Sequence, residues 1–597
     1  MDIEQHAKER GANQSPSDVE EKKSTHVTSS SGDDEHSFQS ASDIHMRGVE
    51  RIAAISAAFT TPLKVILFVG IFLVAYCYGL DATVRYTYQT TATNSYSQHS
   101  LLGTMNTVRA IVAAAIQPPY ARVADKFGRV ELLLFASVFY VVGTAVAAAS
   151  DGVEAFAAGQ LLYQIGYTGL MLLIEVLVAD VTSLQNRVLF SFVPALPFLI
   201  NTWVSGDIAS ATLLRAGWRW GIAMWCIILP VCALALFAPI VMAKRRAAAQ
   251  GKLPPRHLAK GGRGLARAVY DLGSEIDVVG IILLSAMLTL ILLPLTLAGG
   301  TTQTWRSAKI IVMLVFGALC IPLFAIWEVR FARYPCVPFS ALTDRTVIAC
   351  LVIAVGLNMS WYLQGDFLYT VLVVSFDQSV KNATTISSLY SFCSVVTGVL
   401  TGAMVRKTHR VKPFAMAGTL VFILAMGLLI KFRNGSAGVS GMIGGQVVLG
   451  IGGGLFSYPV QALIQAASSH EHMATVTALY LSFYQIGSAL GNAISTAIWT
   501  QVLPGALLQE LGDAALAKDA YSAPLTFVLT YTAGTAERVA MVAAYSHVQR
   551  YLAITGLCLS VITFAASLCL RNFRVDGRQS LSEEERKGGA PPPATVR

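Results

Sequence analysis

The sequence predicts an all-α membrane protein with about 14 transmembrane helices, and three observations support this prediction. Of the 597 residues, 54% are hydrophobic and only 13% are charged, about half the charged fraction of an ordinary soluble domain. The hydrophobic residues form runs of roughly 20, the length that a helix needs to cross about 30 Å of hydrocarbon. The period-2 alternation that transmembrane β-strands require is not visible. The composition therefore excludes a soluble enzyme.

The first six apolar runs form one group, which we expect to be an N-terminal six-helix bundle within residues 61–243. A basic cytoplasmic linker, 244–275, follows this bundle. Two more apolar runs then predict a pair of inserted transmembrane helices within 276–330. The spans expected in these two regions are 63–84, 101–119, 131–150, 153–177, 187–208, 219–242, 276–298 and 308–329.

The remaining apolar runs predict a C-terminal six-helix bundle within residues 346–571, including an outer loop at 504–549. A loop of this length is often functional, and the alternative is a tolerated surface excursion. The polar segments 1–60 and 572–597 predict disordered cytoplasmic tails. The spans expected in the second bundle are 346–370, 384–405, 413–431, 439–463, 474–503 and 550–570.

The basic residues predict the orientation of the chain in the membrane. The net charge of +9 is spread over short connections instead of one patch, which argues against a nucleic-acid partner. Lys and Arg in short loops favour the cytoplasmic side. With the N-terminus inside, the basic connections fall on that side and both termini are cytoplasmic. These connections contain Arg122, Lys126, Arg129, Arg330, Arg333, Arg345, Arg406, Lys407, Arg410, Lys412 and the cluster within 244–267.

Ionisable residues inside predicted spans are the first candidates for function, because each costs about 2.5–3.5 kcal/mol at a helix centre unless it faces a partner or a cavity. Asp81, Glu175 and Asp366 are candidates for proton coupling. Asp81 and Arg85 lie four residues apart on one helical face, so a static ion pair is the alternative for them. Arg109 lies within the second span and is a candidate for binding substrate.

Aromatic and amide side chains also gather in the spans, and as a set they would suit a bulky, partly polar solute. Packing and the interfacial aromatic belt are the alternatives for each single residue. The nine cysteines show no metal-ligand spacing, so we expect no metal site and no cofactor. The candidate substrate-binding residues are Arg85, Gln89, Arg109, Trp361, Tyr362, Tyr390, Tyr480, Tyr484 and Gln485.

The tight turn between the second and third spans, within 121–129, resembles the loop motif of the major facilitator superfamily. Asp125, Lys126, Gly128 and Arg129 carry the resemblance, and Ala121 stands where that superfamily usually has Gly. The resemblance implies the major facilitator fold, two six-helix bundles with two inserted helices, and makes these four residues a conformational switch. The alternative is an ordinary basic loop. A degraded copy at 402–410 indicates two repeated bundles.

The motifs typical of drug exporters in this superfamily are missing. Gln160 stands at the position of their Arg in the fourth span, and the fifth span lacks their Gly-Pro motif. Three other segments resemble the fungal siderophore-iron transporters. They are Tyr76–Gln89, Trp218–Trp225 and Tyr484–Trp499, and the likeness extends over about residues 60–575.

This second resemblance implies proton-coupled uptake of ferric hydroxamate siderophores. The expected partners are a ferric siderophore, protons and the lipid bilayer, and no nucleic acid. The expected location is the plasma membrane, with an endosomal or vacuolar membrane as the alternative. The glutathione exchangers belong to the same family, so the rival hypothesis is an exchanger or exporter of glutathione or toxic compounds. A non-transporting nutrient sensor is a further alternative.

Overall fold

The computed structural model describes residues 58–182, 190, 192–251, 273–274, 276–298, 302–332, 344–433, 438–466 and 473–572. Within these ranges the chain is helical and contains no strand, which confirms the predicted all-α class. Residues 1–57 and 573–597 of the predicted tails, and residues 252–272 and 275 of the predicted linker, lie outside the described residues.

The first half of the described chain packs around one apolar core. Buried side chains from Phe59 to Ala243 form a continuous cluster there. Long apolar stretches explain these helices, because a helix satisfies all of its own backbone hydrogen bonds in lipid. The elements are α2 (Thr61–Ser95), α3 (Leu101–Phe127), α4 (Arg129–Ala148), α5 (Val153–Val181), α7 (Phe198–Arg215), α8 (Gly217–Ala223) and α9 (Trp225–Ala249).

The insert follows as a helical hairpin of α11 (Val278–Leu297) and α13 (Ala308–Ile326), with a short α12 (Thr302–Trp305) between them and a π-helical turn, η1 (Trp327–Phe331), after them. Asp277 ties the two ends of the hairpin together. Its carboxylate accepts from the backbone N–H of Gly280 at 3.1 Å, which caps α11, and from the indole N–H of Trp327 at 2.8 Å.

The second half has its own core, distinct from the first. The segment predicted as a single span, 346–370, falls on two helices, because the chain turns at Asp366 and Phe367. The elements are α14 (Arg345–Gly365), α15 (Leu368–Val374), α16 (Val380–Thr408), α17 (Lys412–Phe432), α18 (Val439–Ala466), α19 (Met473–Leu511), α20 (Ala514–Ser522), α21 (Pro524–Thr530) and α22 (Ala536–Leu568).

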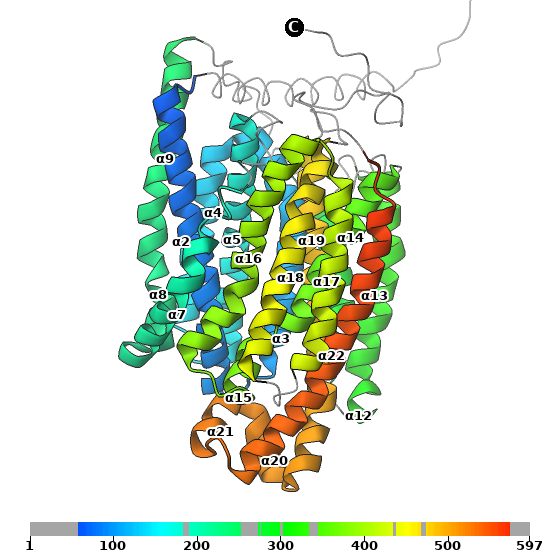
Figure 1. Cartoon of the computed structure of the whole chain (residues 1–597). Helices are drawn as coiled ribbons and strands as arrows, with labels where there is room; N and C mark the ends of the chain where they lie inside the picture. Colours follow the sequence, from blue (N-terminus) through cyan, green and yellow to red (C-terminus); the bar gives the residue numbers. More distant parts are fainter. Residues whose placement is uncertain are drawn as a thin grey trace, which may run out of the picture. The chain divides into compact units, whose positions relative to one another are not determined.

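The predicted outer loop 504–549 is largely helical, and this differs from the predicted boundaries. Helix α19 continues to Leu511, α22 already begins at Ala536, and α20 and α21 lie between them. The reason is a third apolar cluster, in which Leu507, Phe527 and Tyr545 are buried together. We call α20 and α21 the cap, and the end of the molecule at which they lie the cap end (Figure 1).

The cap contacts the first half through the turn between α2 and α3. Asn94 donates to Thr526 at 2.9 Å and accepts from the backbone N–H of Leu525 at 3.0 Å. The backbone N–H of His99 donates to the carbonyl of Ser522 at 3.2 Å. The cap therefore joins elements that are more than 400 residues apart in the sequence.

Eleven helical segments in the described part of the chain are long and apolar enough to cross a membrane. The predicted spans 101–119, 187–208 and 474–503 fall on α3, α7 and α19, which do not meet this standard. Helices α3 and α19 pack against each other, so their polar residues need not face lipid. The total of 14 spans remains a prediction.

Two further contacts join the halves. Helix α7 packs against α16, and α11 packs against both α3 and α19. In the latter contact Leu284, Leu288 and Leu292 of α11 are buried with Ala110 of α3 and Ala489 of α19. The insert therefore covers one side of the contact between the halves.

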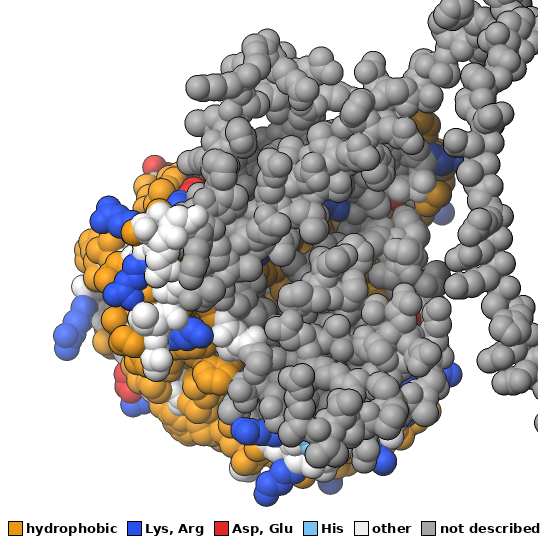
Figure 2. All heavy atoms as spheres, turned by 90° about the horizontal axis from the view of Figure 1, so that it is seen from above, with side chains coloured by type: hydrophobic (Ala, Val, Ile, Leu, Met, Phe, Trp, Pro, Cys, Tyr) orange, Lys and Arg blue, Asp and Glu red, His pale blue; other side chains and the backbone are white. Residues whose placement is uncertain are grey.

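The exterior is apolar where a bilayer would contact it. Large side chains such as Val315, Phe316 and Leu319 of α13 are each more than half exposed. Figure 2 looks onto the end remote from the cap and shows hydrophobic side chains around the visible rim. Among the side chains visible in this view, Lys and Arg are more frequent than Asp and Glu.

Candidate functional site

Asp81 and Arg85 form a buried ion pair on α2. The two side chains are 0% and 1% exposed, and the guanidinium donates to both carboxylate oxygens at 3.0–3.2 Å. The spacing of four residues puts them on one helical face, as expected from the sequence. The ion pair that the sequence left open as an alternative is therefore formed in this structure.

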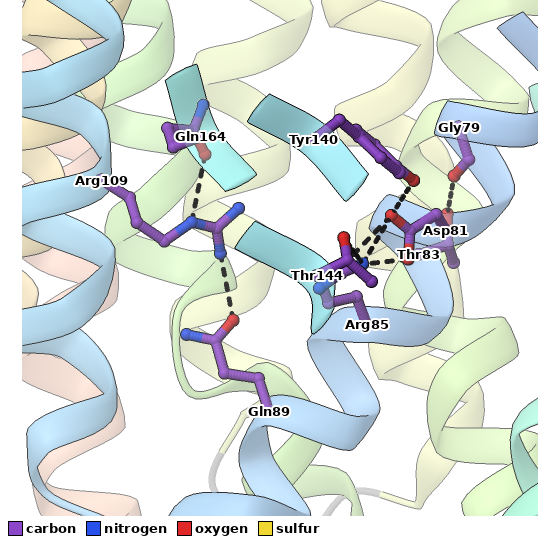
Figure 3. A network of polar contacts seen from close by, with 9 residues as sticks. All are labelled: Gly79, Asp81, Thr83, Arg85, Gln89, Arg109, Tyr140, Thr144 and Gln164. Atoms are coloured by element: carbon purple, nitrogen blue, oxygen red, sulfur yellow. Dashed lines mark hydrogen bonds and ion pairs between the residues drawn. The ribbon is translucent and has the colours of Figure 1, made fainter. Parts of the chain in front are cut away.

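Side chains from α4 and α5 enclose this ion pair. The hydroxyl of Tyr140 donates to Asp81, and Arg85 donates to the hydroxyl of Thr144 at 3.1 Å. The guanidinium carbon of Arg85 lies 3.9 Å from the centre of the Tyr163 ring. A cation over an aromatic face is stabilised by the ring quadrupole, and more strongly when both are away from water. Figure 3 shows Tyr140 and Thr144 pointing toward the ion pair.

Two glycines allow α4 and α5 to approach closely enough for these contacts. A Cβ on Gly143 of α4 would lie 2.0 Å from the backbone nitrogen of Tyr163, and a Cβ on Gly166 of α5 would lie 2.2 Å from that of Tyr140. Both distances are shorter than atoms can tolerate, and the atoms met are backbone. Small residues at such contacts are the usual means by which membrane helices pack at short range.

Arg109 of α3 also lies near Tyr163. Its guanidinium carbon is 5.6 Å from the centre of that ring. It donates to the side-chain oxygens of Gln164 at 3.1 Å and of Gln89 at 3.0 Å (Figure 3). Among the described residues, none of its hydrogen-bond or ion-pair partners is a carboxylate, and the side chain is only half-buried. Arg109 is therefore a cation held by neutral groups.

The amide of Gln89 continues this network toward the second half. Its nitrogen donates to the side-chain oxygen of Asn106 at 3.1 Å, and the nitrogen of Asn106 donates to the carboxylate of Asp366 at 3.3 Å. Asp366 is 2% exposed. The chain of contacts thus runs from Arg109 in the first half to a buried carboxylate in the second.

The turn at Asp366 gives the first half another point of attachment. Because α14 ends there, its last carbonyls have no partner within the helix. The hydroxyl of Tyr86 donates to the carbonyl of Gly365 at 3.1 Å and also to that of Asp366. Nearby, the hydroxyls of Thr87 and Thr384 are 2.9 Å apart. All of these contacts lie toward the cap end of α2.

Glu175 lies toward the opposite end of α5, remote from Asp81 and Asp366 along the helices. Its carboxylate accepts from the amide of Gln461 of α18 at 2.6 Å. This contact also crosses from the first half to the second. The three candidates for proton coupling are therefore not brought together: Asp81 pairs with a guanidinium, whereas Glu175 and Asp366 each accept from a side-chain amide.

Three of the predicted aromatic residues lie together in the second half. The ring of Trp361 is 4.6 Å from that of Tyr362 and 5.6 Å from that of Tyr390. These three are half-buried, as are Tyr484 and Gln485. Tyr480 differs: it is 2% exposed and its hydroxyl donates to the carbonyl of Ser457 at 3.2 Å.

The loop motif forms the turn between α3 and α4. Gly128 adopts φ +105°, a conformation that favours glycine, and Arg129 begins α4. Close by, Glu131 forms an ion pair with Lys244 at 2.7 Å. The side chains of Asp125 and Lys126 lie outside the described part, so the conformational-switch role stays a prediction.

Sequence reasoning selected Gln89 but missed the other neutral partners of the charged candidates. These residues carry no charge, so composition gave no reason to select them from other polar residues in spans. The signal available was position, because Asn106 lies three residues before Arg109 on one helical face. The missed residues are Asn106, Tyr140, Thr144, Tyr163, Gln164 and Gln461.

The comparisons with known proteins agree with one another. The family model described as "Major Facilitator Superfamily" matches residues 67–492 and 346–566. Siderophore iron transporter 1 of Saccharomyces cerevisiae is 41% identical over 534 residues, which are 88% of this chain and 85% of that protein. Siderophore iron transporter mirC of Emericella nidulans is 34% identical, over 93% of this chain and 91% of its own length.

Among solved structures, a bacterial homologue of the human lysosomal transporter Spinster, in an inward-facing and unoccupied conformation, has a TM-score of 0.54 and 13% identity. The match covers 88% of this chain and all of that one. A peptide transporter gives a TM-score of 0.52 at 15% identity, over 87% and 99% of the two chains. These two similarities show the fold.

The family model and the curated relatives span nearly all of the helical region, and their identities exceed 30%. The all-helical structure and its neighbours agree with this assignment and with a transporter instead of an enzyme. The chain therefore belongs to the major facilitator superfamily and, within it, to the fungal siderophore iron transporters.

Proposed function

We propose that this protein takes up ferric hydroxamate siderophores by proton-coupled symport, through alternating access between its two halves. The names of the relatives support the substrate class, since they are siderophore iron transporters at 34–41% identity over most of the chain. The missing exporter motifs support the inward direction.

The observation that carries the proposal is the environment of Arg109. It is a half-buried cation between the halves, held by Gln89 and Gln164 and by no carboxylate among its described contacts. Such a group can donate to the oxygen-rich face of a hydroxamate chelate. The half-buried rings of Trp361, Tyr362 and Tyr390 would contact the apolar parts of the same ligand. The iron travels as part of the substrate.

The partners of the carboxylates support Glu175 or Asp366 as the proton carrier over Asp81. Asp81 is held by Arg85 in a bidentate ion pair, whereas Glu175 and Asp366 accept from the amides of Gln461 and Asn106. Protonation of Glu175 or Asp366 breaks no ion pair, while protonation of Asp81 would leave Arg85 buried without its counter-charge.

We place the cap on the outside and both termini in the cytoplasm, in the plasma membrane. The basic side chains visible at the end remote from the cap support this orientation. An impermeant label applied to whole cells should reach a tag placed in the cap and should not reach one at either terminus. The reverse labelling pattern would overturn the orientation.

Uptake of radioiron-labelled hydroxamate siderophores tests the function. The chain is expressed in cells that lack their own siderophore transporters, with and without a protonophore. Accumulation of one chelate that the protonophore abolishes is the expected result. The same cells given radioiron as a weak citrate complex are the control for non-specific iron entry. If no chelate accumulates while the protein is at the surface, exchange or export of another solute becomes the better reading.

A further inference from the structure

The network between Arg109 and Asp366 has a direction. Arg109 donates to Gln89, Gln89 donates to Asn106, and Asn106 donates to Asp366, at 3.0, 3.1 and 3.3 Å. Each amide accepts with its oxygen and donates with its nitrogen, so the dipoles are aligned from the cation to the carboxylate. Aligned hydrogen bonds of this kind strengthen one another in a low-dielectric interior.

We call the three hydrogen bonds that lead from Arg109 through Gln89 and Asn106 to Asp366 the relay. The complete relay exists only while the two halves are in contact near the cap end. Gln89 and Asn106 belong to the first half, and Asp366 belongs to the second. The contacts of Tyr86 with Gly365 and of Thr87 with Thr384 cross at the same level. A separation of the halves there would break the contact between Asn106 and Asp366 first, since that bond alone of the relay spans the halves.

Breaking the bond between Asn106 and Asp366 weakens the hydrogen bond between Arg109 and Gln89. The buried relay residues Gln89 and Asn106 are 0% and 9% exposed. Without Asp366 at its end, the relay loses its charge, and charged hydrogen bonds are stronger than neutral ones. Arg109 is then bound less tightly by Gln89 and can donate the same N–H to a ligand.

We infer that Gln89 and Asn106 are positioning residues that form, together with Asp366, an internal competitor for Arg109. The inference rests on the proposed function. When the cap end is open, Arg109 is available and the chelate binds tightly. When the cap end closes, the relay re-forms and Gln89 again binds Arg109 tightly. The affinity for the chelate is then lower, which promotes release of the chelate at the other end.

This role differs from the two simpler ones in its kinetic signature. A residue that binds substrate directly raises KM when it is removed. Removal of a residue that only holds the halves together lowers KM only as far as the open fraction of the protein rises. Removal of a competitor for Arg109 lowers KM further and lowers the maximal rate as well, because substrate is retained after closure.

The test compares Asn106→Leu with wild type in the radioiron uptake assay. We expect KM to fall by about threefold to tenfold, the range set by the loss of one net hydrogen bond, with a maximal rate reduced at least as much. Gln89→Leu should act in the same direction. The control is Thr87→Val, which removes a contact between the halves but none of the relay; its KM should fall less than that of Asn106→Leu.

Two results would overturn the inference. One is a raised KM in Asn106→Leu, which would make Asn106 a direct substrate contact. The other is an equal response of KM in Asn106→Leu and Thr87→Val, which would reduce the relay to a simple clasp. Surface expression measured in parallel identifies variants that fail to fold, and Asn106→Ala, which also removes the amide, then replaces Asn106→Leu with the same expected direction.

A readout without transport separates this inference from the proposed function. With the native cysteines replaced, Thr384→Cys is exposed to an impermeant maleimide from outside the cell. Because the relay favours the closed cap end, Asn106→Leu should speed the labelling several-fold even without substrate. If wild type accumulates no chelate but Asn106→Leu still speeds the labelling, the proposed function is wrong and the inference about the relay is supported. If Asn106→Leu leaves the labelling rate unchanged, the inference about the relay is wrong.

Discussion

At the residue scale, the buried pair of Asp81 and Arg85 dominates the electrostatics of the first half. Two opposite charges removed from water stabilise each other only while both are present. One nitrogen of Arg85, Nη1, has no hydrogen-bond partner among the described residues, and the Tyr163 ring against the guanidinium offsets part of that loss. The pair is therefore an obligatory unit.

Removing one charge of this unit should be worse than removing both. We expect Arg85→Gln to destabilise the protein by about 3–5 kcal/mol, because Asp81 would stay buried without its cation. The double variant Asp81→Asn with Arg85→Gln should recover part of that loss. Thermal unfolding in detergent, followed by size-exclusion of the tagged protein, measures both.

The exposed pair of Lys381 and Asp207 provides the control for that experiment. Its atoms are 2.6 Å apart, but both side chains are more than half exposed. Exposed pairs contribute about 0–1 kcal/mol, so Lys381→Gln should change the unfolding temperature little. An Arg85→Gln protein as stable as the Lys381→Gln protein would contradict the argument from burial.

Glu175 permits a conservative test of proton coupling. In Glu175→Gln the side chain can still accept from Gln461, but it can no longer take up a proton. We expect siderophore uptake by this variant to lose its sensitivity to a protonophore and its dependence on external pH. Glu154→Gln, at the exposed start of the same helix, should behave as wild type. If Glu175→Gln still responds fully to the protonophore, Asp366 becomes the candidate to test next.

The sequence could predict the Asp81–Arg85 pair but not the partners of Arg109. A spacing of four residues is visible without a structure, because it repeats the turn of the helix. Gln164 is 55 residues from Arg109, and Asp366 is 260 residues from Asn106. Such contacts depend on how the helices pack, which periodicity does not encode.

At the element scale, the close contact of α4 with α5 positions the side chains around that pair. We expect Gly143→Ala to push the two helices apart, since the added carbon would lie 2.0 Å from the backbone nitrogen of Tyr163. The contacts of Tyr140 and Tyr163 with the ion pair would then lengthen, and uptake and stability should both fall. Uptake and thermal unfolding of the same preparation measure the two effects.

Gly427 of α17 is the matched control for Gly143. A Cβ there would meet nothing within 4 Å. Since Ala favours a helix over Gly by up to about 1 kcal/mol, Gly427→Ala should be neutral or slightly stabilising. The two substitutions are chemically identical. If Gly143→Ala lowers the stability while Gly427→Ala raises it or leaves it unchanged, the difference is due to packing and not to helix propensity. A Gly143→Ala protein that is stabilised like Gly427→Ala would show that α4 and α5 are not in such close contact.

The boundaries of the elements were less predictable than their existence. Most apolar runs became helices at the expected places. The turn at Asp366 and the extension of α19 to Leu511 were not expected. Both depend on tertiary contacts, since Tyr86 satisfies the carbonyls at the turn and the buried Leu507 and Phe527 support the cap.

At the scale of the whole molecule, His99 lies where the first half, the second half and the cap meet. It is fully buried, and its Nε2 lies 3.2 Å from the hydroxyl of Thr370. Its backbone N–H donates to Ser522 of the cap. Burial lowers the pKa of His99 from 6.5 to about 4, because a charged imidazole would lose its hydration there.

This shift predicts that acid weakens the assembled structure. Between pH 6.5 and about 4, the unfolded chain binds a proton at His99 that the folded chain excludes, so stability falls as pH falls through that window, by at most ~1.4 kcal/mol for each unit. Above pH 6.5 the histidine is neutral in both states and contributes no pH dependence.

Thermal unfolding at pH 7.5 and at pH 5 measures this effect. The unfolding temperature of wild type should be lower at pH 5 than at pH 7.5. In His99→Gln this decrease should be smaller. His547→Gln, at an exposed position of α22, serves as the control and should leave it unchanged. An equal decrease in unfolding temperature in all three proteins would show that acid destabilises the protein through groups other than His99.

The all-helical class was the most predictable property of the whole molecule. It follows from the length and composition of the apolar runs, which lipid imposes directly on the sequence. What the sequence did not show is how the insert packs. The apolar faces of α11 and α13 look alike as sequences, yet α11 is buried against α3 and α19 whereas the large apolar side chains of α13 are mostly exposed.

That position of α11 has a mechanical consequence. A helix in contact with both halves must slide on at least one of them whenever the angle between the halves changes. The contact of its leucines with alanines of α3 and α19 is apolar, and among the described residues it contains no hydrogen bond or ion pair. If the halves move as proposed, α11 would slide along this apolar contact with little resistance and would keep lipid hydrocarbon chains out of the space that opens between α3 and α19.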